Sequence, residues 1–361
     1  MTDLRAVVVD DSQFMRTVIS DILEDSGIDV VAKASDGEKG VESVTSEKPD
    51  VVTMDVQMPR MGGIEAVEKI MEEEPTPVLM LSAYTEEGAD ATFEALDKGA
   101  VDFLQKPGGE VSMDIQDLRD SLVEKVRTVA EADVGRQTQK TTSRSTSTST
   151  STSATASQRR PETREEYVDS PTVVIGASTG GPSVLEDVVS HLPVEAEMRL
   201  LIVQHMPDEF TRRFAERLDS VTEYSIREAQ DGDRIGGGEG LVAKGDYHME
   251  VSGYSGGRLR VRLNQEPKIH GVRPAIDVTM ETASDRISDR LVGVVLTGMG
   301  KDGAEGIRSI KEAGGHTIAQ DEETSKVFGI PARAIETGCV DDVLPIDEVA
   351  QGIRRRITTD R

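Results

Sequence analysis

The chain has 361 residues and a formal net charge of −26, from 67 acidic and 41 basic side chains. This length is sufficient for two domains of ordinary size, each with its own core. The acidic balance excludes nucleic acid as an expected partner, because phosphates would be repelled. It is typical instead of a protein kept soluble in a high-salt cytoplasm, where salt screens the self-repulsion.

The cysteine, aromatic and apolar content further limits the kinds of site and core that the protein can have. The single Cys339 cannot form an intramolecular disulfide, and no cysteine cluster predicts a structural zinc site. The N-terminus lacks a signal-peptide pattern and no apolar run reaches the roughly 20 residues of a membrane span, so we expect a cytoplasmic protein without membrane insertion. Aromatic residues make up only 3% of the chain, which suits aliphatic cores of parallel sheets covered by helices.

A Ser/Thr-rich segment divides the chain in two. Residues 135–165 contain the repeat SRSTSTSTSTS and almost no apolar side chains. Such a composition cannot bury a core and predicts a flexible, disordered linker. We therefore expect an N-terminal domain over residues 3–125 and a C-terminal domain over residues 168–357.

The N-terminal part alternates short Val-rich runs with amphipathic helical patterns, which predicts five β/α units and a doubly wound parallel sheet of the flavodoxin-like kind. The expected strands carry the strings AVVVDD, DVVAKA, DVVTMD, PVLMLSA and DFLQKP, and the expected helices span residues 15–25, 37–45, 64–74, 87–98 and 115–129.

The C-terminal part repeats this style and predicts a second doubly wound, Rossmann-like α/β domain. Its expected strands are TVVIG, RLLIVQH, LVGVVLTG and HTIAQ. The Gly- and polar-rich segment from about residue 224 to residue 264 predicts added antiparallel hairpins.

Five polar side chains follow strands of the N-terminal sheet: Asp10, Asp11, Asp55, Ser82 and Lys106. The carboxyl ends of parallel strands meet at one edge, so these side chains are expected together. Three neighbouring carboxylates repel one another unless a cation lies between them, and an all-oxygen set suits Mg²⁺. The alternative is that each acid is solvated or caps a helix.

A candidate nucleophile follows the first strand of the C-terminal part, where TVVIGASTGG breaks into a glycine-rich turn around Ser178. This is the spacing of a nucleophile elbow, in which the serine hydroxyl is exposed between strand and helix. The alternative is a turn that cradles phosphate or only permits close packing.

A base and an acid are available at the same sheet edge. His205 directly follows RLLIVQ, and Asp302 follows the strand and glycine turn LVGVVLTGMGK. In that position His205 can take the Ser178 proton and Asp302 can orient the imidazole. Asp302 can also cap the helix that follows it. The order Ser, His, Asp differs from that of α/β-hydrolases, chymotrypsin and subtilisin.

Residues 3–125, with VVTMDVQMPRMGG, resemble a two-component receiver domain. The resemblance implies Asp55 as the phospho-acceptor, Lys106 as the cation that neutralises the phosphoryl oxygens, and Ser82 with Phe103 as the switch pair. It also implies a Mg²⁺ site formed by Asp10, Asp11, Asp55 and the backbone carbonyl of Gln57.

The strings GASTGG, QHMP, LTGMGKDG, FTRRFAERL, GDYHME, RPAIDVTM and TIAQDEETSKVFGIP resemble the catalytic domain of the chemotaxis protein-glutamate methylesterase (CheB) family. With the receiver, the resemblance covers the chain from end to end and, given its acidity, indicates a halophilic member. It implies Ser178 as nucleophile, His205 as general base and acid, and Asp302 as orienting carboxylate, with an oxyanion site near Thr179 and Met299.

The implied reaction is hydrolysis of glutamate γ-methyl esters on chemoreceptors to glutamate and methanol, without a cofactor, with deamidation of receptor glutamines as a companion activity. A chemotaxis histidine kinase is the implied phosphodonor. We expect the unphosphorylated receiver to cover the triad and phosphorylation of Asp55 to loosen it. Two alternatives remain: a non-catalytic phosphate-binding module, and a receiver-controlled transcription factor, which the acidic surface opposes.

Overall fold

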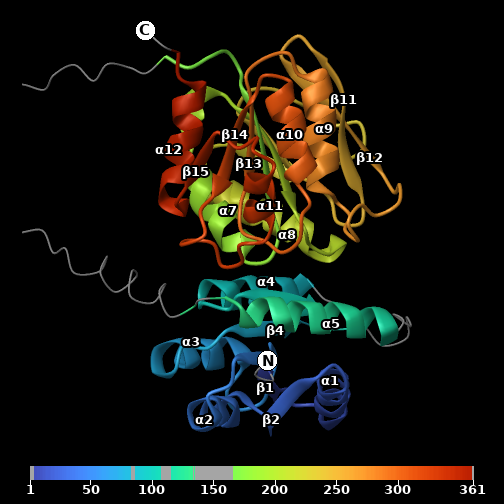
Figure 1. Ribbon diagram of the computed structural model, residues 1–361, viewed down its shortest axis with the longest axis vertical. Helices are drawn as coiled ribbons and strands as arrows, with labels where there is room; N and C mark the ends of the chain where they lie inside the picture. Colours follow the sequence, from blue (N-terminus) through green and yellow to red (C-terminus); the bar gives the residue numbers. More distant parts are fainter. Residues whose placement is uncertain (1–3, 83–85, 107–114, 133, 135–165, 360–361) are drawn as a thin grey trace, which may run out of the picture.

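The computed structural model describes residues 4–82, 86–106, 115–132, 134 and 166–359. The predicted linker over 135–165 lies outside these residues. Figure 1 shows two α/β domains stacked along the long axis of the molecule, with the N-terminal domain below and the C-terminal domain above. No helix within the described ranges is both long and apolar enough to span a bilayer.

The N-terminal domain is a five-stranded sheet with strand order β2-β1-β3-β4-β5, and all of its strand pairs are parallel. The strands are β1 (Leu4–Val9), β2 (Ile28–Ala34), β3 (Val51–Asp55), β4 (Val78–Ser82) and β5 (Asp102–Gln105). The helices are α1 (Gln13–Asp25), α2 (Gly37–Glu47), α3 (Gly63–Glu73), α4 (Glu86–Asp97) and α5 (Ile115–Ala130). The doubly wound fold is confirmed, and each helix lies where the sequence pattern predicts one.

The C-terminal domain is built on a seven-stranded sheet with strand order β15-β14-β13-β6-β7-β10-β8 and parallel pairing throughout. A three-stranded sheet, β11-β12-β9, packs beside it with antiparallel pairing. The main-sheet strands are β6 (Thr172–Ala177), β7 (Arg199–Gln204), β8 (Ser225–Glu228), β10 (Glu239–Val242), β13 (Leu291–Val295), β14 (His316–Gln320) and β15 (Asp342–Leu344). The small sheet contains β9 (Arg234–Ile235), β11 (His248–Ser255) and β12 (Arg258–Asn264).

Helices cover the larger sheet and supply the surfaces around its active edge. They are α7 (Gly181–Ser190), α8 (Asp208–Val221), α9 (Ile276–Arg286), α10 (Ala304–Glu312), α11 (Ile330–Glu336) and α12 (Ile346–Ile357), with a 3₁₀ turn over Val194–Ala196. In Figure 1, α7, α8 and α11 form the lower side of this domain, facing α4 and α5 of the N-terminal domain.

The prediction of hairpins between residues 224 and 264 is correct for only part of that segment. Strands β11 and β12 form an antiparallel hairpin, but β8 and β10 join the main sheet in parallel. Each of these two strands has four residues, and buried apolar side chains such as Ile226 and Leu241 stand among Gly and charged neighbours. So short an apolar signal does not distinguish a hairpin strand from a strand of a parallel sheet.

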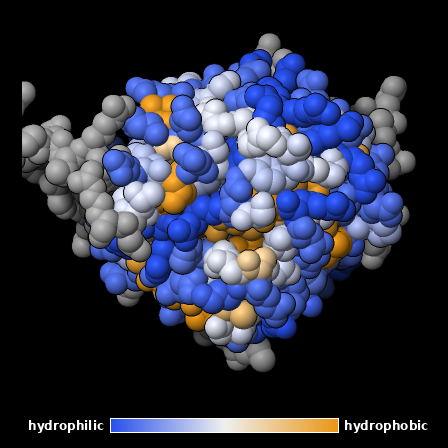
Figure 2. Space-filling view, turned by 90° about the horizontal axis from the view of Figure 1, so that it is seen from above, coloured by the Kyte–Doolittle hydropathy of each residue, from blue (hydrophilic) through white to orange (hydrophobic). Residues whose placement is uncertain are grey.

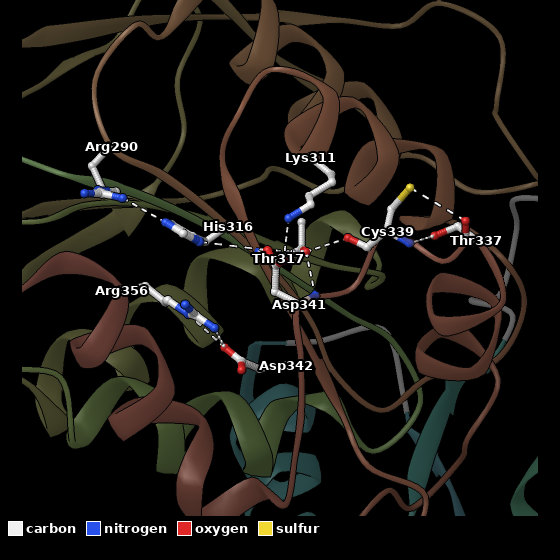
Figure 3. A network of polar contacts seen from close by, with 9 residues as sticks. All are labelled: Arg290, Lys311, His316, Thr317, Thr337, Cys339, Asp341, Asp342 and Arg356. Atoms are coloured by element: carbon white, nitrogen blue, oxygen red, sulfur yellow. Dashed lines mark hydrogen bonds and ion pairs between the residues drawn. The ribbon is translucent and has the colours of Figure 1, made fainter.

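The amino ends of β14 and β15 are joined by polar side chains (Figure 3). Asp341 accepts hydrogen bonds from the backbone amide and hydroxyl of Thr317, at 3.1 and 3.2 Å, and pairs with Lys311. The Thr317 hydroxyl also donates to the backbone oxygen of Cys339 at 2.6 Å. Because this network lies at the strand starts, it braces the edge of the sheet opposite the expected active site.

A continuous apolar core joins the two domains. Phe93 of α4 and Phe103 of β5 contact Phe210 and Phe214 of α8, with ring centroids 4.5 Å apart for Phe103 and Phe210 and 5.9 Å apart for Phe93 and Phe214. All four rings are buried. By contrast, the end of the catalytic domain seen from above in Figure 2 is largely hydrophilic. The receiver is therefore docked on the catalytic domain through a specific apolar surface.

Candidate active site and receiver site

The turn around Ser178 has the geometry that the glycine-rich sequence predicts. Strand β6 ends at Ala177, and helix α7 begins at Gly181 after Gly180, whose φ of 76° favours glycine. A side chain at Gly181 would collide with the Gln204 amide oxygen, 2.0 Å from the ideal Cβ position. Ser178 is half-buried at the start of this turn, where a nucleophile can meet a substrate.

Register between neighbouring strands brings His205 beside Ser178. Ala177 of β6 pairs with Gln204 of β7, so Ser178 and His205 are the next residues on adjacent parallel strands. The His205 amide donates to the Ala177 oxygen at 3.1 Å, which continues the ladder to the edge. The position inferred from the sequence is therefore the position in the structure.

Asp302 arrives from the strand on the other side of β6. Its Oδ2 lies 2.7 Å from His205 Nε2 and accepts from the Ile276 amide at 2.6 Å, while Oδ1 accepts from the Asp277 amide at 3.0 Å. Burial pushes the pKa of the Asp302 carboxyl upward, but the His205 contact and these backbone amides outweigh it and lower the pKa. Asp302 is thus held in its charged form against the imidazole.

The contact between His205 and Asp302 also determines which ring nitrogen is available to the serine. With Nε2 directed at the carboxylate, Nδ1 is the nitrogen left to accept the Ser178 proton, the reverse of the chymotrypsin arrangement. In the described part of the chain the Ser178 hydroxyl makes no hydrogen bond, to His205 or to any other group. Catalytic hydrogen bonds of this type commonly tighten only when substrate binds.

Asp277 is a site residue that sequence reasoning missed. It is 3% exposed, and its Oδ1 accepts from the amides of Gly303 and Gly306, both at 2.8 Å. Asp302 in turn accepts from the amides at the start of α9, so it caps α9 and not the helix that follows it, while Asp277 caps α10. Burial, and then the nearby Asp302 charge, raise the pKa of Asp277, while His270 lies 3.1 Å from its Oδ2. The string RPAIDVTM contains Asp277 but nothing in it indicates this pairing.

Gln204 and Thr297 hold the nucleophile turn through hydrogen bonds, and the sequence analysis did not identify either of them. The Gln204 amide nitrogen donates to the oxygens of Ser178 and His205, at 2.9 and 3.1 Å. The Thr297 oxygen accepts from the Ser178 amide at 3.0 Å, and its hydroxyl donates to the Thr179 oxygen at 3.0 Å. Gln204 ends β7 and Thr297 follows β13 by two residues. A polar residue in such a position indicates an active edge of the sheet, but it does not indicate which group it will contact.

The two residues expected at the oxyanion site contact the receiver. The Thr179 hydroxyl donates to Asp102 Oδ2 at 2.9 Å, and Met299 Sδ contacts the Thr128 hydroxyl of α5. Gly298 lies against Ser178, since a Cβ there would come within 2.7 Å of the serine Cβ. The loop 297–300 and the nucleophile turn therefore form one surface, and the receiver covers part of it.

The predicted acid cluster of the receiver is assembled at the carboxyl edge of its sheet. Asp10, Asp11 and Asp55 each place a carboxylate oxygen within 4.8 Å of the others. Lys106 Nζ lies 2.7 Å from Asp10 and 2.8 Å from Asp55. Three carboxylates and one ammonium leave net negative charge at the edge, and an all-oxygen donor set of this kind fits Mg²⁺.

The Asp55 carboxyl differs electrostatically from an ordinary surface acid. Burial raises the pKa of Asp55, and the Lys106 ammonium offsets this increase only in part. The Gln57 backbone amide donates to the same carboxylate. The predicted role of the Gln57 carbonyl as a metal ligand stays a prediction.

The predicted switch pair is directed away from the acid cluster. The Ser82 hydroxyl donates to the Gly88 oxygen at 3.1 Å and accepts from Thr92 at 2.7 Å, both on α4. Phe103 is stacked on Phe210 of the catalytic domain. Ser82 is therefore hydrogen-bonded to α4, and Phe103 is packed in the interface with the catalytic domain. A switch would have to move this helix and this interface.

Comparison with known proteins gives a family model for each domain. A family model described as CheB methylesterase matches residues 173–353, and one described as response regulator receiver domain matches residues 6–117. The chain belongs to the CheB methylesterase family. It combines the family's hydrolase domain with a response-regulator domain.

The relatives extend this similarity over the whole chain. A protein-glutamate methylesterase/protein-glutamine glutaminase of Haloarcula marismortui is 60% identical, over 99% of this chain and 98% of the relative. One of Pyrococcus abyssi is 44% identical, over 98% and 94%. The crystal structure of the Thermotoga maritima CheB methylesterase catalytic domain aligns with a TM-score of 0.50 and 39% identity, covering 53% of this chain and all of that one. Relatives in Haloarcula, Halobacterium and Natronomonas agree with the halophilic setting expected from the charge.

Proposed function

We propose that the chain is a chemotaxis response regulator that hydrolyses glutamate γ-methyl esters on chemoreceptors, with Ser178, His205 and Asp302 as its catalytic residues. The observation that carries this proposal is the 2.7 Å contact between His205 and Asp302 beside the turn that exposes Ser178. A phosphate-cradling turn has no use for a buried carboxylate that orients a histidine. The division into a receiver over 3–125 and a catalytic domain over 168–357 belongs to the same proposal.

The chemistry follows from the three side chains. The Ser178 hydroxyl attacks the ester carbonyl while Nδ1 of His205 takes its proton, and Asp302 stabilises the imidazolium that results. The imidazolium then returns the proton to the departing methoxide, which leaves as methanol. Water then attacks the acyl-serine while His205 takes its proton, and His205 returns this proton to the Ser178 oxygen as the acyl bond breaks. This step releases the glutamate side chain and free Ser178. Backbone amides near Thr179 and Met299 stabilise the tetrahedral oxyanion.

The same residues can act on a receptor glutamine. Attack on the side-chain amide gives the same acyl-serine, and His205 protonates the leaving group, which departs as ammonia. We include this deamidation in the proposal because relatives of 60% and 44% identity carry the name protein-glutamine glutaminase along with methylesterase.

The receiver supplies the regulation. Asp55 is the phospho-acceptor, with a histidine kinase of the chemotaxis system as donor and the cytoplasm as the place of reaction. A Mg²⁺ ion held by Asp10, Asp11, Asp55 and the Gln57 carbonyl would neutralise charge on the transferred phosphoryl group. Lys106, already 2.8 Å from Asp55, is placed to contact the phosphoryl oxygens.

Occlusion is the regulatory step that the docked arrangement supports. In the unphosphorylated chain, Asp102 holds the Thr179 hydroxyl and α5 contacts Met299, both beside Ser178. Phosphorylation draws Ser82 toward Asp55, which breaks its contacts with α4 and weakens the packing of Phe93 and Phe103 on α8.

The serine assignment is tested with methylated receptor and a fluorophosphonate probe. We expect Ser178→Ala to abolish methanol release and probe labelling, because the nucleophile is lost. Ser183→Ala, a change of the same size on the following helix, is the control and should keep both. Methanol release by the Ser178→Ala variant would disprove the triad.

The regulatory assignment is tested with acetyl phosphate as donor. The parent chain should release methanol faster after phosphorylation, whereas Asp55→Asn should stay at the unstimulated rate because it has no acceptor. Asp29→Asn, an exposed change on β2, should respond as the parent does. Stimulation of the Asp55→Asn variant would show that another residue accepts the phosphoryl group.

A further inference from the structure

One stripe of α8 faces the receiver beside the nucleophile turn. Phe210, Arg213, Phe214 and Arg217 are spaced at one and two helical turns, so their side chains share a face. We call these four residues the α8 stripe. Its two phenylalanines are fully buried, and its arginine side chains are 31% and 29% exposed.

The receiver covers the α8 stripe with an acidic helix. Arg217 lies 3.0 Å from both carboxylate oxygens of Asp97 and its guanidinium carbon lies 5.2 Å from the centre of the Phe93 ring. Arg213 lies 3.9 Å from Asp90. One face of α4 carries Asp90, Phe93 and Asp97. The two acids and the aromatic ring of this face are therefore complementary to the arginines and phenylalanines of the α8 stripe.

The α8 stripe starts close to the catalytic residues. Helix α8 begins at Asp208, three positions after His205, and the receiver that covers the stripe also holds Thr179 through Asp102. A protein substrate that reaches Ser178 must displace the receiver from this region. The α8 stripe is therefore uncovered at the moment when the substrate binds.

Holding the receiver does not by itself account for the two arginines. The partners Asp90 and Asp97 are 59% and 47% exposed, and ion pairs between exposed side chains contribute little to stability. Within the catalytic domain, Glu216 of α8 pairs with Arg213 and Glu186 of α7 pairs with Arg217, each at 2.8 Å. Burial pushes the pKa of Arg217 downward, but the carboxylates of Glu186 and Asp97 outweigh it and raise the pKa, so the cation persists. On a chain of net charge −26, a basic stripe beside the nucleophile selects an acidic partner.

We propose that the α8 stripe is the docking surface for the substrate protein, and that it takes an acidic amphipathic helix whose carboxylates flank an apolar side chain. Helix α4 of the receiver occupies the stripe as an internal competitor with the same chemistry. This inference rests on the proposed function, since a glutamate-modifying enzyme must bind a glutamate-bearing surface.

The test separates covering from docking with two pairs of substitutions in the full-length chain. Asp90→Asn with Asp97→Asn weakens the cover and leaves the α8 stripe intact. Arg213→Ala with Arg217→Ala weakens the cover and also removes the basic groups of the stripe. Arg212→Ala, an exposed change on the same helix outside the stripe, is the charge control. Labelling of Ser178 by a fluorophosphonate should speed up in both pairs, which shows that the site is folded and uncovered.

Binding is then measured with a receptor cytoplasmic fragment that carries glutamate at its modification positions, so that no turnover occurs. We expect the aspartate pair to bind more tightly than the parent chain, and the arginine pair to bind at least about tenfold more weakly than the aspartate pair. Arg212→Ala should match the parent. Equal affinity of the two pairs would overturn the docking surface. Absence of methanol release from methylated receptor, with the affinity difference intact, would overturn the proposed function and leave the docking surface standing.

Discussion

At each active edge of the molecule, one aspartate has a raised pKa and another a lowered pKa, but the two domains use them in opposite ways. In the receiver, burial raises the pKa of Asp55, the proposed acceptor. At Asp36, at the same edge, burial is outweighed by the Lys39 amide and Arg60, which lower the pKa to about 2. In the catalytic domain the proposed orienting acid, Asp302, has the lowered pKa, and Asp277 behind it has the raised one.

This contrast follows from what each carboxylate must do. An acceptor needs free oxygens for the incoming phosphoryl group, so few backbone amides neutralise it and the Lys106 ammonium shares its charge. An orienting acid must stay ionised while the imidazole changes charge, so backbone amides and the histidine hold it. A lowered pKa indicates a fixed hydrogen-bonding role at both edges; the predictions below test that rule at Asp302 and Asp36, and Asp277 shows what a capping acid of raised pKa contributes.

The largest effect is expected at Asp302. An Asp302→Asn substitution keeps the shape but removes the charge that stabilises the imidazolium, and it favours the wrong tautomer of His205. We expect kcat for methanol release to fall on the order of 10³- to 10⁴-fold. The exposed Asp285→Asn change on α9 is the matched control. A kcat within about tenfold of the parent would show that Asp302 acts only as a helix cap.

A smaller effect is expected at Asp277, which contacts Asp302 and the start of α10 but not His205. Removing the cap with Asp277→Ala frees the amides of Gly303 and Gly306 and displaces Asp302, so kcat should fall by about 10- to 100-fold with little change in KM. Asp277→Asn should keep most of the activity, because its amide oxygen still accepts from both glycines. The neutral amide also resembles the protonated carboxyl, which a raised pKa favours. Equal damage in the two variants would mean that the Asp277 charge is itself required.

The parallel architecture allowed the main site residues to be located from the sequence. Ser178, His205 and Asp302 each follow an apolar strand, and strand ends of a parallel sheet share an edge, so an order along the chain became a position in space. The same reasoning placed Asp10, Asp55 and Lys106 together. Both doubly wound sheets are predicted by the alternation of short apolar runs with amphipathic helical patterns.

Contacts between elements distant in the sequence could not be predicted in this way. Asp277 and Asp302 cap each other's helices across 25 positions, and Arg217 meets Asp97 across 120. Each partner has an ordinary local explanation as a surface or capping residue. Only tertiary packing selects the pair, and the same limit hid the parallel pairing of β8 and β10.

The smallest effect concerns stability and is expected at Asp36. Its side chain caps α2 through the Lys39 amide at 3.1 Å and pairs with Arg60. Since its pKa is lowered from 3.8 to about 2 in the folded chain, its stabilisation is fully present above the unfolded pKa and is lost as pH falls through the folded one. Asp36→Ala should therefore lower the free energy of unfolding of the receiver by about 1 kcal/mol at neutral pH.

That difference should shrink between about pH 4 and pH 2, as the parent loses its advantage. Denaturant unfolding of the parent and the variant across this range measures it. Asp29→Asn, on the neighbouring strand and exposed, should show no such pH-dependent difference. If the gap between parent and Asp36→Ala stayed constant down to pH 2, the charge of Asp36 would not contribute, and the rule that lowered pKa values mark fixed hydrogen-bonding acids would fail in the receiver.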